Sequence, residues 1–184
     1  MNDETLRAHL LQTVRAELQR LRGYGDRALG QVTADDDLEA ALDGESNSIG
    51  VLVRHLAGNM RSRFTDFLTS DGEKPDRDRD GEFDPARRMG RAELLALWKE
   101  GWDRVFAALD SLTPAHADAK VHIRGEELSV VEALLRQVAH YGAHVGQIVF
   151  LAKHLEARAG RPWASLTIPR GQSKTGNWLY KGRS

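Results

Sequence analysis

The chain has 184 residues, enough for one domain with a hydrophobic core, and 41% of them are hydrophobic. Charged residues make up 29%, but the net charge is only -1, so nothing favours nucleic acid or an anionic membrane as a partner. There is no cysteine, no signal-peptide pattern and no apolar run of the roughly 18 residues that a membrane span needs. We therefore expect a cytoplasmic protein without disulfides, thiolate metal sites or a cysteine nucleophile.

The first predicted helix begins close to the N-terminus. Apolar residues recur every three or four positions from Leu6 to Leu21, which is the period of an amphipathic helix. Gly23 and Gly25 predict its end. A threonine followed by three aspartates opens residues 33–42, and this pattern predicts the capped start of a short helix.

A second long helix is predicted from a cap at Ser48 to about Leu68. His55, Asn59 and Arg63 follow the edge of its apolar arc at four-residue steps, where polar groups can face a cavity. Contact with an acidic substrate is one interpretation of Arg63, and of Arg136 further along the chain, but we expect surface ion pairs.

The middle of the chain predicts a loop, a helix and a hairpin. Residues 70–81 are charged and poor in apolar side chains, which predicts a surface loop whose aspartates and arginines pair with one another and with solvent. Covering the mouth of a pocket is the alternative role for this loop. Leucines and tryptophans predict a third helix over residues 94–109, ending before Pro114. Residues 120–128 have extended character with a glycine turn and predict a small hairpin.

The last predicted helix, residues 129–156, carries two histidines beside its apolar seam. His140 and His144 lie four residues apart on one face, the spacing that lets two imidazoles share a metal ion. Gln147 continues their polar stripe. In the same helix Gly142 and Gly146 each cost about 1 kcal/mol relative to alanine, which predicts close approach of a neighbouring helix.

A histidine pair needs a third ligand from another element. His55 is the candidate, because it lies on the matching edge of the second long helix. Neutral imidazoles suit zinc, nickel, copper or iron, and three protein ligands leave one position open for water or substrate. The histidines at 9, 122 and 154 lie on other faces or elements and are not included. A purely structural bundle that binds no metal stays as an alternative.

Five segments at residues 55–63, 66–74, 79–83, 136–147 and 165–171 follow one another in a consistent order along nearly the whole chain. Together they resemble the DUF1572 branch of the DinB-like superfamily, which also includes YfiT-type candidate metalloenzymes. The resemblance implies an all-α, up-down-down-up four-helix bundle over residues 1–160, usually a homodimer. It also implies a divalent metal, zinc or nickel foremost, held by His55, His140 and His144.

The resemblance also implies a type of chemistry. Some relatives resemble thiol-dependent S-transferases or isomerases that use bacillithiol or mycothiol, so we expect a metal-dependent transferase or related hydrolase acting on a small electrophile. The low-molecular-weight thiol would be a cosubstrate, because the chain has no cysteine. Asn59 and Gln147 could orient an imidazole or a bound water, with structural hydrogen bonding as the alternative. The alternative function is a non-catalytic metal-binding or stress-related dimeric bundle that acts through its surface.

Residues 161–184 predict an extended C-terminal tail. The segment has too many turn residues for a helix and too many large apolar residues for a free end. We expect Trp163, Leu166 and Ile168 to pack against the bundle or against a partner subunit.

Overall fold

The computed structural model describes residues 2–174, and most of them are helical. The long helices are α1 (Asp3–Leu29), α2 (Ile49–Phe64), α4 (Arg91–Asp110) and α5 (Val130–Arg158). The shorter elements are the 3₁₀ helices η1 (Asp35–Glu39) and η2 (Pro114–His116), the helix α3 (Arg79–Glu82) and the strands β1 (Lys120–Ile123) and β2 (Glu126–Ser129). The strands form the predicted antiparallel hairpin, so the fold is mainly helical with a small sheet. No described helix has the length and apolarity to cross a membrane.

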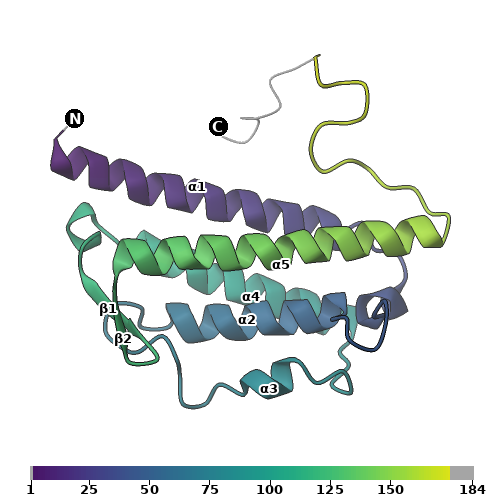
Figure 1. The fold of residues 1–184 in the computed structure, drawn as a ribbon, viewed down its shortest axis with the longest axis horizontal. Coiled ribbons are helices and arrows are strands. Elements are labelled where there is room, and N and C mark those ends of the chain that lie inside the picture. The colour runs from purple at the N-terminus through teal and green to yellow at the C-terminus, as the bar shows by residue number, and fades with distance from the viewer. Residues whose placement is uncertain (1, 175–184) are drawn as a thin grey trace.

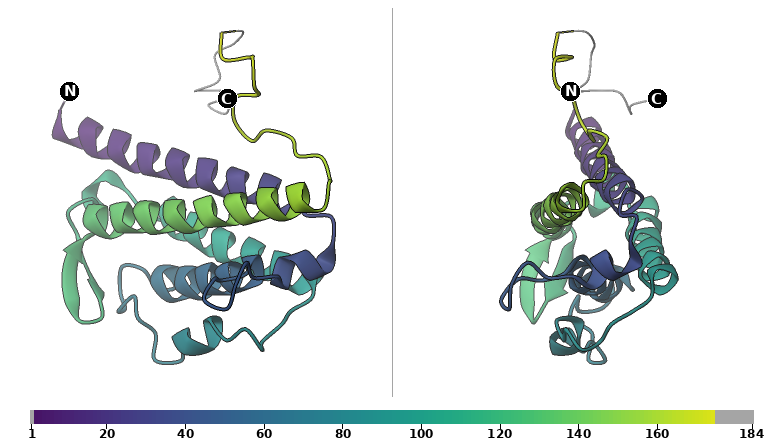
Figure 2. Two further views of the ribbon diagram at one scale, coloured as in Figure 1. Left: turned by 45° about the vertical axis from the view of Figure 1, so that its right-hand side comes forward. Right: turned by 90° about the vertical axis from the view of Figure 1, so that its right-hand side faces the viewer.

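The long helices pack in two pairs. Helix α1 lies along α5, and α2 lies along α4 (Figures 1 and 2). Figure 1 shows α1 and α5 running in one direction and α2 and α4 running in the other. Helix α2 also contacts α5, and this contact brings the candidate site residues together.

Polar side chains cap the helix starts. The Ser48 hydroxyl accepts a hydrogen bond from the Val51 amide at 3.1 Å, and the Ser129 hydroxyl accepts one from the Glu132 amide at 3.2 Å. Glu132 in turn accepts from the Ser129 amide at 2.7 Å, which completes a capping box. The cap at Ser48 was predicted. The cap of α1 at Asn2 was not.

Helix α1 does not end at Gly23 and Gly25 but continues to Leu29. The reason is packing, because a Cβ atom on Gly25 would lie 2.3 Å from Cζ2 of Trp98 on α4. Gly25 therefore lets α4 approach α1 closely. The packing of Trp98 against Gly25 outweighs the cost of about 1 kcal/mol that glycine has relative to alanine inside a helix. The short helix predicted within residues 33–42 is also different, because the structure has a 3₁₀ helix, η1, that ends at Glu39.

The glycines of α5 behave in the opposite way. A Cβ on Gly142 would only touch a Leu21 methyl at 4.0 Å, and a Cβ on Gly146 would meet nothing within 4 Å. No helix within residues 2–174 approaches them closely, so that prediction was wrong. The end of α2 also moves, to Phe64, and Asp66 just beyond it has a positive φ of 49°.

The core lies between the four long helices. Its largest fully buried side chains include Trp102 of α4 and Tyr141 of α5, whose ring centroids are 5.7 Å apart in an edge-to-face contact. Trp98 is also buried. The apolar residues of α5 face this core, and the polar stripe that contains His140 and His144 lies beside them on the same helix.

The described part of the tail packs near the end of α1. Trp163 and Leu166 contact the core, whereas Ile168 is 38% exposed. The Ala164 amide donates to Oε1 of Gln31 at 2.7 Å, and the Gln31 amide group donates back to the Ala164 carbonyl at 3.2 Å. The predicted tail continues to residue 184, and its last ten residues lie outside the described part of the chain.

Candidate metal centre

The contact between α2 and α5 brings three histidines together. His55 comes from α2, and His140 and His144 come from successive turns of α5. One ring nitrogen from each lies within 4.8 Å of the other two. Within residues 2–174 this is the one group of three histidine, cysteine or acidic side chains arranged closely enough to hold a metal ion.

The nitrogen spacing fits a metal ion. Nε2 of His55 and Nε2 of His140 are 3.2 Å apart. Two nitrogens bound to a tetrahedral zinc ion at about 2.0–2.1 Å lie about 3.3–3.4 Å from each other. The rings meet edge to face, with centroids separated by 5.3 Å for His55 and His140 and by 4.7 Å for His140 and His144. Three histidines so placed can hold a divalent ion and leave coordination positions open.

His55 is oriented by an acidic residue from α3. Its Nδ1–H donates to Oε2 of Glu82 at 3.0 Å, which leaves Nε2 with the lone pair that faces His140. Both side chains are buried. Gly58 makes the approach possible, since a Cβ there would lie 2.1 Å from Oε1 of Glu82.

Arg77 holds Glu82 in place. Its Nε donates to Oε1 and its Nη2 donates to Oε2, both at 2.8 Å, so the pair is bidentate. Burial raises the pKa of Glu82, but the hydrogen bonds from Arg77 and His55 outweigh this and lower it. The Arg77 side chain is 2% exposed. Residues 70–81 are therefore not simply a surface loop of solvated ion pairs, because Arg77 is part of the interior.

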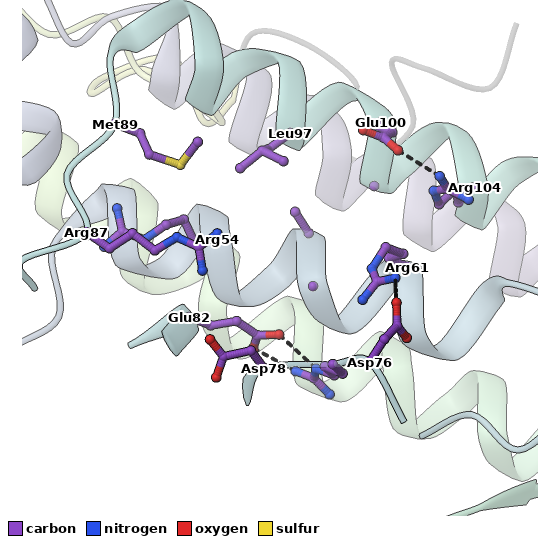
Figure 3. Close-up of a pocket in the computed structure, with 14 residues that line it drawn as sticks. Arg54, Arg61, Asp76, Asp78, Glu82, Arg87, Met89, Leu97, Glu100 and Arg104 are labelled. Atoms are coloured by element: carbon purple, nitrogen blue, oxygen red, sulfur yellow. Dashed lines mark hydrogen bonds and ion pairs between the residues drawn. The ribbon is translucent and has the colours of Figure 1, made fainter. Parts of the chain in front are cut away.

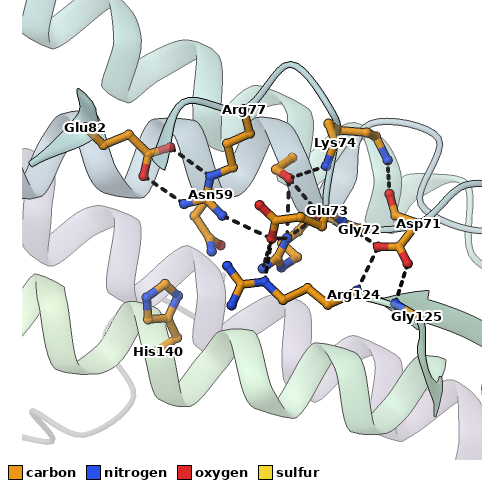
Figure 4. A network of polar contacts seen from close by, with 12 residues as sticks. Asn59, Asp71, Gly72, Glu73, Lys74, Arg77, Glu82, Arg124, Gly125 and His140 are labelled. Carbon is orange, nitrogen blue, oxygen red and sulfur yellow. Dashed lines mark hydrogen bonds and ion pairs between the residues drawn. The ribbon is translucent and has the colours of Figure 1, made fainter. Parts of the chain in front are cut away.

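A wider network ties this loop to the hairpin (Figure 4). Glu73 accepts two hydrogen bonds from Arg63 at 3.0 Å each and one from Nε of Arg124 at 2.9 Å. Asp71 accepts from the backbone amides of Arg124 and Gly125 at 2.9 and 2.8 Å. Arg63 is thus buried and paired, rather than at the surface as predicted. Arg136 is exposed on α5.

The two predicted orienting residues have different contacts. Nδ1–H of His144 donates to Oε1 of Gln147 at 2.8 Å, which leaves Nε2 of His144 unprotonated. Oδ1 of Asn59 instead accepts from the Tyr141 hydroxyl at 3.1 Å, and both residues are buried. Asn59 therefore joins the core packing of α2 and α5, and Gln147 contacts the histidine cluster.

The surroundings favour the neutral form of the two imidazoles on α5. Burial lowers the pKa of His140 to about 4, and the nearby positive charges of His144, His55, Arg63 and Arg77 act in the same direction. Burial also lowers the pKa of His144. Neutral rings have the free lone pairs that metal binding requires.

A cavity of about 240 Å³ lies behind Glu82, between α2, α4 and the segment that contains α3 (Figure 3). Its charged lining is largely paired. Arg61 donates to Asp76 and Arg104 donates to Glu100, each at 2.7 Å. Glu82 and Arg77 line this cavity as well, so their ion pair separates it from the histidine cluster.

A comparison with known families identifies the family of this chain. The family described as Protein of unknown function (DUF1572) matches residues 5–172. The chain belongs to the DUF1572 family. This confirms the resemblance seen in the sequence. No curated protein and no solved structure matches this chain.

Sequence reasoning did not identify Glu82 and Arg77 as site residues. The segment 79–83 of the DUF1572 protein was among those that carry the resemblance, but its glutamate had no assigned partner. Gly58, one turn after His55, was the available signal, since a glycine inside a helix can mark close approach of another group.

Proposed function

We propose that the DUF1572 protein binds one divalent metal ion, zinc or nickel, through His55, His140 and His144. The observation that carries this proposal is the gathering of three ring nitrogens within 4.8 Å from two different helices. The same ligand set follows from the DinB-like resemblance. The proposal includes an up-down-down-up bundle over residues 1–160, a docked tail over residues 161–184 and a homodimer.

The proposed activity is transfer of a low-molecular-weight thiol to a small electrophile. A divalent metal with an open position supplies a lowered pKa for a bound thiol, which makes the sulfur a thiolate nucleophile at neutral pH. In the transfer the sulfur bonds to the electrophilic carbon, the leaving group departs with its electron pair, and the thiol proton goes to solvent.

The charges around the histidine cluster support an anionic ligand. Arg63, Arg77 and Arg124 surround two carboxylates, those of Glu73 and Glu82. Three guanidinium groups against two carboxylates leave one positive charge beside the cluster, and this charge favours a thiolate over a cation.

Metal analysis of protein purified without a histidine tag tests the metal centre. We expect near-stoichiometric metal in the unmodified protein and its loss in His55→Ala and His140→Ala. His154→Ala is the matched control, because this histidine stacks on Phe150 near the end of α5 and is not one of the cluster. Equal metal content in all four proteins would contradict the proposed ligand set.

Turnover is tested separately, with the metal-loaded protein and a panel of electrophiles combined with several thiols. Product formation that disappears in His140→Ala would support the transferase. A metal-loaded protein that turns over none of these pairs would favour a non-catalytic metal-binding or stress-related bundle. Light scattering at the assay concentration determines whether the active form is a homodimer.

A further inference from the structure

A groove of about 510 Å³ opens between α5 and the segment that precedes α2. The proposed metal centre does not use it. Its lining includes Leu42, Leu52, Gly146, Gln147, Phe150 and Leu151. This volume lies within the range of about 300–1,000 Å³ that is usual for small-molecule sites.

The groove begins where the histidine cluster ends. Gln147, which accepts the hydrogen bond from His144, is also a wall of the groove. On α2, Leu52 precedes His55 by three residues, and on α5 Gln147 follows His144 by three. Because α2 and α5 run in opposite directions, both steps lead the same way, by about 4.5 Å along the helix axes.

The lining is mostly apolar and almost uncharged, with Ser46, Asn47 and Gln147 as its neutral polar residues. Leu52 and Leu151 are buried, Leu42 is partly buried against the core, and Phe150 is 62% exposed. Glu45 is the one charged lining residue, so a cation is not repelled but an anion has no partner there. The arginines lie elsewhere, around Glu73 and Glu82.

Gly146 lines the groove beside open space. A Cβ atom at this position would meet no other atom within 4 Å, so the glycine is not required by packing within the described chain. A glycine inside a helix costs about 1 kcal/mol relative to alanine. Its effect here is to leave space beside Gln147, one turn beyond the histidine cluster.

We infer that this groove binds the apolar body of an uncharged small-molecule substrate, with its reacting end directed to the histidine cluster. This inference rests on the proposed thiol transfer and assigns the groove to the electrophile. An alkyl or aryl group would contact the leucines and Phe150.

The groove itself is tested with a neutral fluorescent probe, N-phenyl-1-naphthylamine, on metal-free protein. We expect binding to the unmodified chain and at least tenfold weaker binding to Gly146→Trp, which fills the groove. Two controls should bind the probe normally. Gly146→Ala carries the same gain in helix propensity with little volume, and Ala157→Trp adds the same ring to an exposed position of α5 outside the lining.

The link to the metal centre is tested with cobalt-loaded protein and straight-chain thiols from ethanethiol to hexanethiol. Sulfur-to-cobalt absorption reports binding of the thiol sulfur at the metal, and the alkyl chain stands in for the apolar body of the substrate in the groove. Affinity should rise by up to about fourfold for each methylene group that becomes buried. In Gly146→Trp this increase should disappear, while the cobalt spectrum and the ethanethiol affinity stay the same.

The outcomes separate the two proposals. An unchanged affinity along the series, with an intact cobalt spectrum, would overturn the groove assignment and leave the metal centre in place. Absence of cobalt binding would overturn the metal centre, and the naphthylamine probe would then decide the groove alone. Failure of the probe to bind, together with a change in oligomeric state in Gly146→Trp, would assign the groove to a contact between two copies and overturn the inference.

Discussion

The orientation of His55 depends on a residue 27 positions further along the chain. Glu82 fixes the proton on Nδ1, and Arg77 fixes Glu82. Such a carboxylate behind a histidine sets both the ring orientation and the basicity of the nitrogen that remains free. Residues with no direct contact to a metal therefore control how well the three histidines bind one.

Glu82→Gln is expected to weaken zinc affinity by about 10–100-fold, because the neutral amide loses the charge that polarises His55 and the bidentate pair with Arg77. Chelator competition measures the affinity, and the cobalt spectrum shows whether the ligand geometry changes. Asp76→Asn is the matched control, because Asp76 lies on the same loop as Arg77, is exposed, and pairs with Arg61 of α2 at 2.7 Å. A folded Glu82→Gln protein with normal affinity and spectrum would show that Glu82 does not position His55.

At this scale the sequence predicts the three histidines but not Glu82. The spacing of His140 and His144 follows from helix geometry alone, and His55 lies on a helix edge that periodicity defines. The position of Glu82 depends on the path of an irregular segment over α2, which no local pattern determines. The space that Gly58 leaves for Glu82 can be recognised only when the path of that segment is known.

Among the elements, α1 differs most from its predicted form. Gly23 and Gly25 are breakers by propensity, yet the helix continues through both. Trp98 packs over Gly25 and is held by a hydrogen bond from its Nε1 to Oδ1 of Asp26 at 2.6 Å. Periodicity located the long helices, while their ends depend on contacts with other helices that the sequence does not display.

Gly25→Ala should destabilise the protein by about 1–3 kcal/mol, because the added methyl overlaps a tryptophan that is fixed in place. Gly142→Ala is the paired test on α5, where the nearest atom is 4.0 Å away, and should gain up to about 1 kcal/mol. Urea unfolding gives both values. A stabilising effect of both substitutions would mean that propensity, not packing, governs α1.

The end of α5 is held by a buried carboxylate. Glu156 accepts hydrogen bonds from the Thr33 amide at 2.9 Å and from Nε of Arg161 at 2.7 Å, and Arg161 also pairs with Asp37. The hydrogen bond from Arg161 is the main cause that lowers the pKa of Glu156. A lowered carboxyl pKa stabilises the fold above the unfolded value of about 4.3, and this stabilisation is lost as the pH falls through the folded pKa.

Glu156→Gln should therefore cost about 1.5–3 kcal/mol near neutral pH, and the deficit should shrink as the pH drops below about 4. Urea unfolding near neutral pH and below about pH 4 measures the difference in the free energy of unfolding between the variant and the unmodified protein. Glu127→Gln removes an exposed partner of Lys120 at 3.1 Å and should change stability by less than about 1 kcal/mol. A deficit that stays constant from neutral to acid pH would show that ionisation of Glu156 does not contribute.

Across the whole molecule, the histidine cluster joins the two helix pairs. Helix α2 packs mainly on α4 and α5 mainly on α1, so ligands from α2 and α5 would connect one pair to the other. Binding to the folded state alone stabilises it by mass action. The mainly helical fold and its order of elements were predictable from periodicity, whereas the pairing of helices required tertiary contacts.

Zinc at 100 times its dissociation constant should stabilise the protein by about 2.7 kcal/mol, which corresponds to a rise in Tm of about 5–11 °C for a chain of this size. Differential scanning fluorimetry with and without metal measures the shift. His140→Ala should show none, and His154→Ala should match the unmodified protein. An equal shift in His140→Ala would place the stabilising ion elsewhere.

The hairpin has a further consequence for the histidine pair of α5. Ser129 is both the last residue of β2 and the cap of α5, so no residue separates strand from helix. The other end of the hairpin is held by Asp71 at its two-residue turn, where φ is 58° at Arg124 and 77° at Gly125. One residue gained or lost at the junction would rotate the following helix by about 100° and turn both histidines away from His55. The hairpin thus fixes the rotation of α5 about its own axis, and with it the direction in which both histidines point.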